Sequence, residues 1–239
     1  MPNPPIEKSA FICADSWFKL PSMENKSRIA VCFALAEEAG AFKKLRGDAT
    51  PVFFTGIGRA NAEKAVRQFL AANSPELLLT CGFAGGLRPE WKIGDVLFEI
   101  REDRGNDDFA VLRAKLTEAG AKPAKIFCAD RIAVTAAEKK KLREQTSADA
   151  AEMESGAIHA VCQQNGVPCA TVRVISDTAD EDLPFDFNNY LKEDKSVDMS
   201  KLMMAVAKAP WKMGALMALQ KNTKLAAEKL AEVLGKIVA

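Results

Sequence analysis

The sequence predicts a single α/β domain with a mixed, mostly parallel central sheet flanked by helices. Two observations predict it: several short runs are apolar at every position, and segments of helical periodicity stand between them. A strand that is apolar throughout has both faces buried, which is typical of a parallel sheet covered by helices on both sides. The length of 239 residues and the 48% share of apolar residues fit one large domain.

The first part of the chain alternates between strand and helix patterns. An apolar run from Ile29 is followed by a short helical segment whose first turn carries carboxylates, a favourable place for negative charge. We expect the glycine-rich segment Gly82–Gly86 to end the third strand, and strand character to resume after Gly94. The predicted strands here are Ile29–Leu35, Val52–Phe54, Leu77–Cys81 and Asp95–Ile100, and the predicted helices are Glu37–Leu45 and Ala60–Ala72.

The second part of the chain is more helical. Cys169–Ile175 is the last strong strand pattern, because it is rich in β-branched residues. Beyond it we predict helices, with a break at Pro210 and a final helix that is apolar on one face. We divide the chain into an N-terminal extension, residues 1–27, and one domain, residues 28–239. The other predicted elements are the helices Asn106–Ala119, Ala136–Glu144 and Glu154–Gln164 and the short strands Ile126–Cys128 and Ile132–Val134.

Composition and charge limit the possible partners. The chain carries 33 basic and 32 acidic side chains, so its net charge of +1 indicates no broad surface for nucleic acid or an anionic membrane. No segment approaches the roughly 18 consecutive apolar residues of a membrane span. We interpret the basic stretch Lys139–Arg143 as the solvated face of a helix. The expected partner is therefore a small molecule.

The six cysteines indicate the redox environment. They are scattered through apolar runs without CxxC or Cys/His ligand spacing, which predicts buried free thiols and no metal site. Free thiols persist in a reducing compartment, so the cytoplasm is the expected location.

Polar or glycine-rich residues follow several of the predicted strands. In open α/β sheets the ligand binds beyond the carboxyl ends of the strands, so these positions are the first candidates for a functional site. The four segments are Ala36-Glu37-Glu38, Thr55–Arg59, Gly82–Gly86 and Ser176-Asp177.

The Thr55–Arg59 segment resembles a dinucleotide-binding turn only in part. Gly56 and Gly58 have the required spacing, but Asn61 stands where the third glycine or alanine is needed. A nicotinamide cofactor is therefore disfavoured, and no cofactor is predicted. The alternative is a tight strand-to-helix turn that lines another small-ligand site.

Glu152-Met153-Glu154 places two carboxylates where a short strand passes into a helix. A carboxylate at such a place can accept hydrogen bonds from the vicinal hydroxyls of a sugar. The alternative interpretation is a solvated helix N-terminus, where negative side chains are favourable.

Taken together and in order, these motifs resemble the purine nucleoside phosphorylase and nucleosidase superfamily, over roughly residues 28–182. They are most similar to methylthioadenosine/S-adenosylhomocysteine nucleosidases. The part from Met153 into Leu183-Pro184 is also similar to hopanoid-associated nucleoside phosphorylases. The motifs are Ala36-Glu37-Glu38, Thr55-Gly56-Ile57-Gly58, Cys81–Leu87, Ile93-Gly94-Asp95-Val96, Ala151-Glu152-Met153-Glu154 and Val172–Asp177.

The resemblance implies cleavage of an N-glycosidic bond by two carboxylates. By matched position, Glu38 is the general base for water, Thr55 and Arg173 help to hold that water, and Asp177, oriented by Ser176, donates a proton to purine N7. This pairing is chemically reasonable, because the sugar becomes cationic and the base anionic as the bond breaks.

The resemblance also implies the substrate-binding residues. Glu154 corresponds to the ligand of the ribose hydroxyls, Met153 packs on the sugar, and Ile132 and Ala133 are candidates for the purine edge. The family commonly pairs its subunits, so a homodimer is expected. The remaining residues that we assign to substrate binding are Gly56, Phe83, Ala84, Gly85 and Glu152.

Two departures from the family pattern favour water over phosphate as the nucleophile. Phe83 stands where the family usually has a small hydroxyl residue, and would crowd the phosphate pocket of the phosphorylases. Their arginine-bearing phosphate loop near the first strand is missing. Arg59, Arg88 and Arg173 nevertheless leave an anion site open.

Three hypotheses follow. The first is hydrolysis of an adenine nucleoside such as methylthioadenosine or S-adenosylhomocysteine. The second is phosphorolysis of an adenosyl compound. The third is a nucleoside-binding module without catalysis. The presence of both Glu38 and Asp177 argues against the third hypothesis. His159, inside the helix beyond Glu154, is interpreted as a packed or surface side chain.

Overall fold

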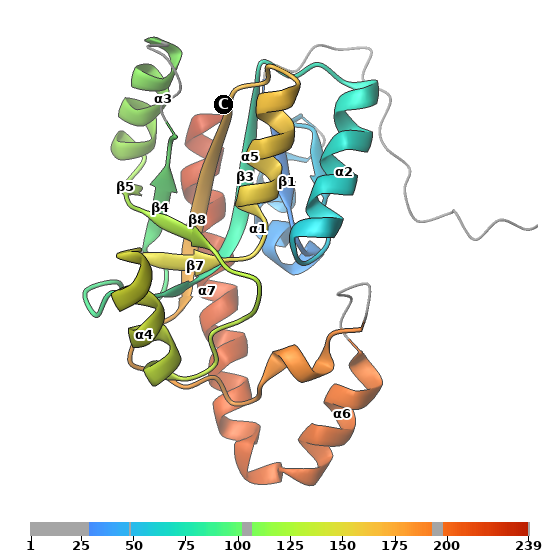
Figure 1. Cartoon of the computed structure of the whole chain (residues 1–239), viewed down its shortest axis with the longest axis vertical. Helices are drawn as coiled ribbons and strands as arrows, with labels where there is room; N and C mark the ends of the chain where they lie inside the picture. Colours follow the sequence, from blue (N-terminus) through green and yellow to red (C-terminus); the bar gives the residue numbers. More distant parts are fainter. Residues whose placement is uncertain (1–28, 48, 102–106, 193–197, 239) are drawn as a thin grey trace, which may run out of the picture.

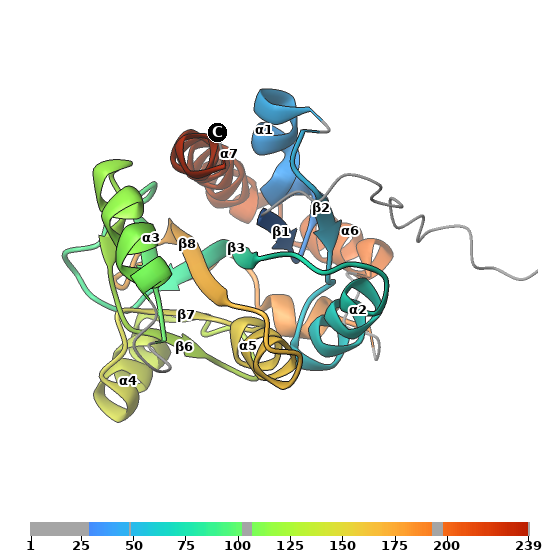
Figure 2. The same cartoon turned by 90° about the horizontal axis from the view of Figure 1, so that it is seen from above.

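A computed structural model describes residues 29–47, 49–101, 107–192 and 198–238. The predicted N-terminal extension lies outside these residues. The described chain forms one layered unit, with a central sheet and helices on both of its faces (Figures 1 and 2). The predicted fold, a single α/β domain with a mixed, mostly parallel sheet, is confirmed.

The sheet runs in the order β2-β1-β3-β8-β4-β5, with β7 beside the end of β3 and β6 beside β7. The pairs β1–β2, β1–β3, β3–β8, β4–β5 and β6–β7 are parallel, whereas β7 and β4 run antiparallel to β3 and β8, respectively. The strands are β1 (Ile29–Phe33), β2 (Val52–Phe54), β3 (Leu77–Gly86), β4 (Val96–Glu99), β5 (Lys122–Pro123), β6 (Ile126–Cys128), β7 (Ala150–Glu152) and β8 (Cys169–Asp177).

Helices cover both faces of the sheet. Figure 2 shows α1 and α7 on one side of β1 and β3, and α2 and α5 on the other. None of the described helices is long and apolar enough to cross a bilayer. The helices are α1 (Ala36–Arg46), α2 (Arg59–Ala72), α3 (Asp107–Glu118), α4 (Ala136–Thr146), α5 (Ser155–Gln164), η1 (Phe187–Tyr190), α6 (Met199–Lys208), η2 (Pro210–Lys212) and α7 (Met213–Ile237).

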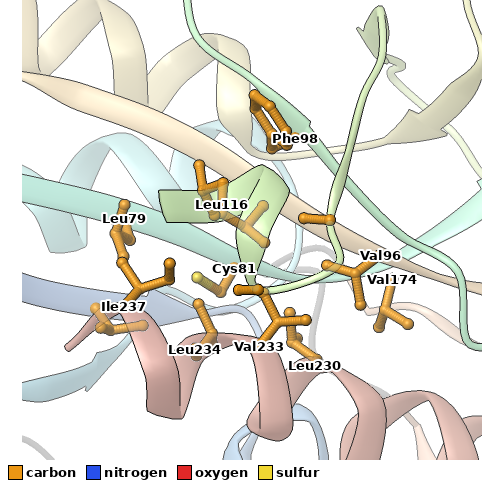
Figure 3. Packing of buried hydrophobic residues seen from close by; sticks show 14 of the residues in the cluster. Leu79, Cys81, Val96, Phe98, Leu116, Val174, Leu230, Val233, Leu234 and Ile237 are labelled. Atoms are coloured by element: carbon orange, nitrogen blue, oxygen red, sulfur yellow. The ribbon is translucent and has the colours of Figure 1, made fainter. Parts of the chain in front are cut away.

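The strand β1 explains why the central strands are apolar at every position. Successive side chains point to opposite faces of the sheet, so Val31 and Phe33 enter the core below α1 and α7, while Ala30 and Cys32 pack toward α2 and α5. Figure 3 shows the first of these cores, in which side chains of α7 pack on β3, β4 and β8. The described cysteines Cys32, Cys81, Cys128, Cys162 and Cys169 are free and buried, and Cys13 lies outside the described residues.

Two predictions about the strands were wrong. The glycines do not end the third strand, because β3 continues to Gly86 and pairs there with β8 and β7. Pairing on both sides outweighs the weak strand preference of glycine. Ile132–Val134 is not a strand either. Its backbone is held by the side chain of Asn188, which donates to Ile132 O and accepts from Ile132 N.

Candidate active site

A cavity of about 280 Å³ lies beside the carboxyl ends of β1, β3 and β8. This is the edge at which open α/β sheets bind their ligands. Of the predicted site residues, Thr55, Gly56 and Arg173 lie outside its lining. Those that line the cavity are Glu38, Phe83, Ala84, Gly85, Ile132, Ala133, Glu152, Met153, Glu154, Ser176 and Asp177.

Glu38 is fixed by the start of α1 and by β3. It lies in the first turn of the helix, and its Oε2 accepts a hydrogen bond from Leu35 N at 2.9 Å. Its Oε1 accepts from Phe83 N at 2.8 Å. The side chain is 6% exposed, and this burial raises the pKa of Glu38 above the ordinary carboxyl value. The structure therefore holds a partly desolvated base in one orientation.

Gly82 leaves the space that the Glu38 carboxylate occupies. A Cβ at Gly82 would stand 2.6 Å from Glu38 Oε1, and the backbone there has a φ of +152°. Gly85 has the same relation to Asp177, because a Cβ there would stand 3.2 Å from Asp177 Oδ2. Gly82 and Gly85 are three residues apart, which is about 10 Å along a β-strand, and both carboxylates line the same cavity.

An irregularity in β8 brings two neighbouring side chains to the cavity. Ala84 pairs with Ile175, but Gly85 pairs with Asp177, so Ser176 is an extra residue in β8. In a regular strand, consecutive side chains point to opposite faces, and a bulge re-aims them. Both Ser176 and Asp177 consequently line the cavity.

Glu152 and Arg173 form a buried ion pair behind the cavity. Arg173 Nη2 lies 2.6 Å from Glu152 Oε2, and their side chains are 2% and 1% exposed. Glu152 also accepts hydrogen bonds from the backbone amides of Glu154 and Ser155 at the start of α5, and from Ser155 Oγ. Burial acts to raise the pKa of Glu152, but the Arg173 guanidinium and the hydrogen bonds from Ser155 together outweigh burial and lower that pKa. Glu152 lines the cavity, but hydrogen bonds within the protein already occupy most of the acceptor positions of its carboxylate.

Glu154 has more capacity to bind a ligand. Its Oε1 accepts from Gly58 N at 2.7 Å, and its Oε2 accepts no hydrogen bond from the described residues. Burial and the neighbouring Glu152 carboxylate raise the pKa of Glu154 to about 7. Glu154 therefore presents a carboxylate oxygen to the cavity, close to its titration point at neutral pH.

The glycine turn Thr55–Arg59, which partly matched a dinucleotide motif, helps to position the Glu154 carboxylate. Gly56 and Gly58 have φ values of +75° and +85°, which glycine adopts readily, and Gly58 directs its amide at Glu154. The Thr55 hydroxyl contacts the backbone carbonyls of Phe33 and Gly56 at 3.3 and 3.0 Å. This agrees with the alternative interpretation, a tight turn beside another small-ligand site.

Asp177 is held by two side chains. Ser176 Oγ donates to Asp177 Oδ1 at 2.9 Å, which is the orienting contact that the resemblance implies. Lys139 Nζ lies 2.6 Å from Asp177 Oδ2, with a lysine side chain that is 1% exposed. The ammonium also donates to Thr178 O and Glu181 O, at 2.6 and 2.9 Å. All three of its hydrogen-bond donors are thus used.

Lys139 corrects one interpretation of the sequence. We expected the whole stretch Lys139–Arg143 to be solvated, and Lys140 and Lys141 are indeed exposed. Lys139 instead lines the cavity. Sequence reasoning missed it because a basic run favours the surface. The weak signal was its spacing of three residues from Leu142, the one large apolar residue of α4, which puts both on one face.

Each of the three arginines that the sequence left open as an anion site pairs with a carboxylate, although Arg173 Nε and Nη1 have no hydrogen-bond partner among the described residues. Arg131, which lines the cavity, pairs with Glu138. Arg59 pairs with Asp130 and donates to Cys128 O. Arg88 pairs with Glu90 and Asp149, and Arg173 pairs with Glu152. None of the three arginines lines the cavity.

His159 is a packed side chain, as predicted. Its Nε2 lies 2.8 Å from Thr171 Oγ1 and it does not line the cavity. Burial lowers the pKa of His159 to about 4, so the ring is neutral at physiological pH.

A family model described as the phosphorylase superfamily matches residues 28–109 and 110–208. The chain belongs to the phosphorylase superfamily. This membership confirms the resemblance that the strand-end motifs indicated.

Relatives of this superfamily chain include nucleosidases of two kinds. It is 28% identical to the aminodeoxyfutalosine nucleosidase of Campylobacter jejuni over 176 residues, which cover 63% of this chain and 77% of the relative. It is 29% identical to the 5′-methylthioadenosine/S-adenosylhomocysteine nucleosidase of Shewanella sediminis over 199 residues, which cover 71% of this chain and 84% of the relative.

Solved structures share the superfamily fold. The futalosine hydrolase of Helicobacter pylori superposes with a TM-score of 0.64 at 20% identity, over 89% of this chain and 97% of the other. The 5′-methylthioadenosine/S-adenosylhomocysteine nucleosidase of the same organism, with butyl-thio-DADMe-Immucillin-A, gives a TM-score of 0.63 at 20% identity, over 88% and 97%.

Part of the cavity wall comes from the C-terminal segment of this superfamily chain. Leu183, Phe187 in η1 and Leu219 in α7 add apolar surface. Sequence reasoning missed them because no motif links this segment to the strand ends. Leu219 also lies beyond the residues that the family model matches.

Proposed function

We propose that the protein hydrolyses the N-glycosidic bond of an adenine nucleoside, such as methylthioadenosine or S-adenosylhomocysteine. The observation that carries the proposal is that Glu38 and Asp177 both line one cavity, against Gly82 and Gly85 of β3. Nucleosidases among the relatives support the same class of activity.

In this proposal Glu38 activates the attacking water. Two backbone amides fix its carboxylate, and its raised pKa makes it a better base than an exposed glutamate. The carboxylate also stabilises the positive charge that develops on the sugar. Arg173, behind the wall, balances the negative charge of Glu38, Glu152 and Glu154. We assign Thr55 a positioning role, since its hydroxyl contacts backbone carbonyls.

Asp177 and Lys139 supply the proton that the leaving purine needs. Lys139 Nζ lies 2.6 Å from Asp177 Oδ2, so a proton can move between the two groups. As the C–N bond breaks, the proton passes from Nζ to Asp177 and from Asp177 to N7, so the base leaves neutral. Glu38 receives the proton of the attacking water. After product release Glu38 gives that proton to solvent, and solvent returns one to the Lys139–Asp177 pair. We therefore assign Lys139 the role of proton source for Asp177.

Glu154 and Met153 bind the ribose in this proposal. The unoccupied Oε2 of Glu154 accepts hydrogen bonds from the sugar hydroxyls, and Met153 packs against the ring. Ile132 and Ala133 lie on the cavity lining with Ala84 and Gly85, where they suit the flat purine.

The acid side of the pH profile should report two carboxyl groups. The profile of kcat/KM follows groups of the free enzyme. Glu38 and Glu154 must both be ionised to act, and their pKa values are raised, for Glu154 to about 7. We expect kcat/KM to fall as the pH drops through 7. In Glu154→Gln the contribution of Glu154 to this fall should disappear, so that only Glu38 shapes the acid limb; an unchanged limb would contradict the assignment.

The second candidate, phosphorolysis, is disfavoured because none of Arg59, Arg88 and Arg173 lines the cavity. Phe83 lines the cavity where a phosphate would have to enter.

Replacing Phe83 by Ser should open that space and produce phosphate-stimulated cleavage while some hydrolysis is retained. Phe83→Leu, which keeps apolar bulk, serves as the control. Ribose 1-phosphate as the main product of the wild type would make the phosphorylase alternative correct.

One assay tests the proposed function directly. Free adenine should be released from adenosyl nucleosides in buffer without phosphate, and the rate should not rise when phosphate is added. A protein that binds these nucleosides without releasing adenine would be the non-catalytic module instead.

We further propose a cytoplasmic homodimer. The buried free thiols support a reducing compartment. The resemblance to nucleosidases that pair their subunits supports the dimer. Light scattering at micromolar concentration should report twice the chain mass, and a monomer there would count against this proposal.

A further inference from the structure

The C-terminal hairpin, residues 199–225, consists of α6, η2 and the first half of α7. Figure 1 shows it extending beyond the sheet, with η2 at its far end. Only its inner side packs on the protein: Val206 is buried, while most other side chains of α6 and the start of α7 are exposed. The outer side of this hairpin has no role in the proposed catalysis.

All the charged side chains of the hairpin are basic. It contains Lys201, Lys208, Lys212, Lys221 and Lys224 and no aspartate or glutamate. Because the whole chain carries +1, the other residues together carry −4. All five lysines are exposed. Lys208, Lys221 and Lys224 form no ion pair with the described residues, so their charge is available to an external partner.

Large apolar side chains stand among these lysines. Trp211 in η2 is 77% exposed, the highest value of any large hydrophobic residue in the described chain. Met203 and Met204 of α6 and Met213 and Met217 of α7 are 43% to 63% exposed. A folded protein rarely leaves such a group in water unless it binds a partner.

Basic side chains flank the exposed apolar ones along the hairpin. On α7, Met213, Met217 and Lys221 follow at intervals of four residues and share one face. On α6 the order is reversed, because Lys208 is nearer to η2 than Met204 is. Lys212 stands next to Trp211 within η2. The apolar side chains can therefore enter the interface while the long lysine side chains reach up to the lipid headgroups.

We propose that this hairpin binds the surface of an anionic lipid bilayer. Trp211 and the methionines enter the interface, and the lysines contact lipid phosphates. A second copy of the chain fits poorly, because a two-fold interface would bring together the five lysines of each copy without a carboxylate of the hairpin to pair with them. Nucleic acid would use the lysines and leave the methionines in water. The proposal concerns attachment to one surface of the membrane and does not depend on the proposed catalysis.

Flotation of the full-length protein with vesicles tests whether the lysines of the hairpin bind anionic lipid. Vesicles of phosphatidylcholine with roughly one third phosphatidylglycerol should bind the protein at least tenfold more strongly than pure phosphatidylcholine, and salt should weaken the binding. The variant K208Q/K221Q/K224Q should lose roughly 10²-fold in partitioning, at about fivefold per lysine. The matched control K64Q/K140Q/K141Q removes three exposed lysines elsewhere and should bind like the wild type.

A second variant, M203S/W211S/M217S, tests insertion. It should reduce vesicle binding tenfold or more while far-ultraviolet circular dichroism gives an unchanged melting curve. Three results would overturn the proposal: no binding to anionic vesicles, equal loss in the K64Q/K140Q/K141Q control, or a dimer that M203S/W211S/M217S turns into a monomer. The last result would make the hairpin a subunit interface.

Discussion

Replacing Asp177 by asparagine is expected to lower kcat by roughly 10²–10⁴-fold while nucleoside binding is largely kept. Asparagine preserves the shape of the side chain and can still contact Ser176 Oγ. It cannot carry a proton from Lys139 to the purine. Only the interaction needed in the transition state is removed, so the loss should fall on kcat and leave KM nearly unchanged.

Steady-state adenine release and equilibrium nucleoside binding measure these two effects separately. Asp180→Asn is the matched control, because Asp180 is exposed, lies three residues away and does not line the cavity. It should behave like the wild type. An Asp177→Asn enzyme with unchanged turnover would overturn the assignment of Asp177 as the acid.

The layer structure could be predicted from sequence because it depends on periodicity. β1 is apolar on both faces, and the helices between the strands have one apolar side. The length of β3 could not be predicted, because Gly85 and Gly86 become strand through pairing with β7. β7 pairs with these glycines from 64 to 66 residues later in the chain, and local propensity carries no information about such a partner.

The candidate site could be predicted where its residues follow strands, as Glu38 and Asp177 do. Residues that reach the cavity from elsewhere gave no such signal. Lys139 comes from the inner face of α4, and Leu219 comes from a helix beyond the family motifs. The net charge of +1 likewise concealed the basic hairpin, because acidic residues in the rest of the chain offset its five lysines.

Replacing Lys139 by methionine should lower kcat on the order of 10²-fold at neutral pH. Methionine keeps an unbranched chain of similar length and removes the ammonium. The variant leaves the Asp177 carboxylate without its counter-charge and without its proton source. Lys140→Met is the matched control, because Lys140 is exposed on the same helix and should tolerate the change.

A double-mutant cycle separates proton supply from simple support of the loop at Thr178 and Glu181, whose carbonyls Lys139 also holds. In an Asp177→Asn background, Lys139→Met should cost little more, because both changes interrupt the same transfer. Additive losses would mean that Lys139 acts only through the loop.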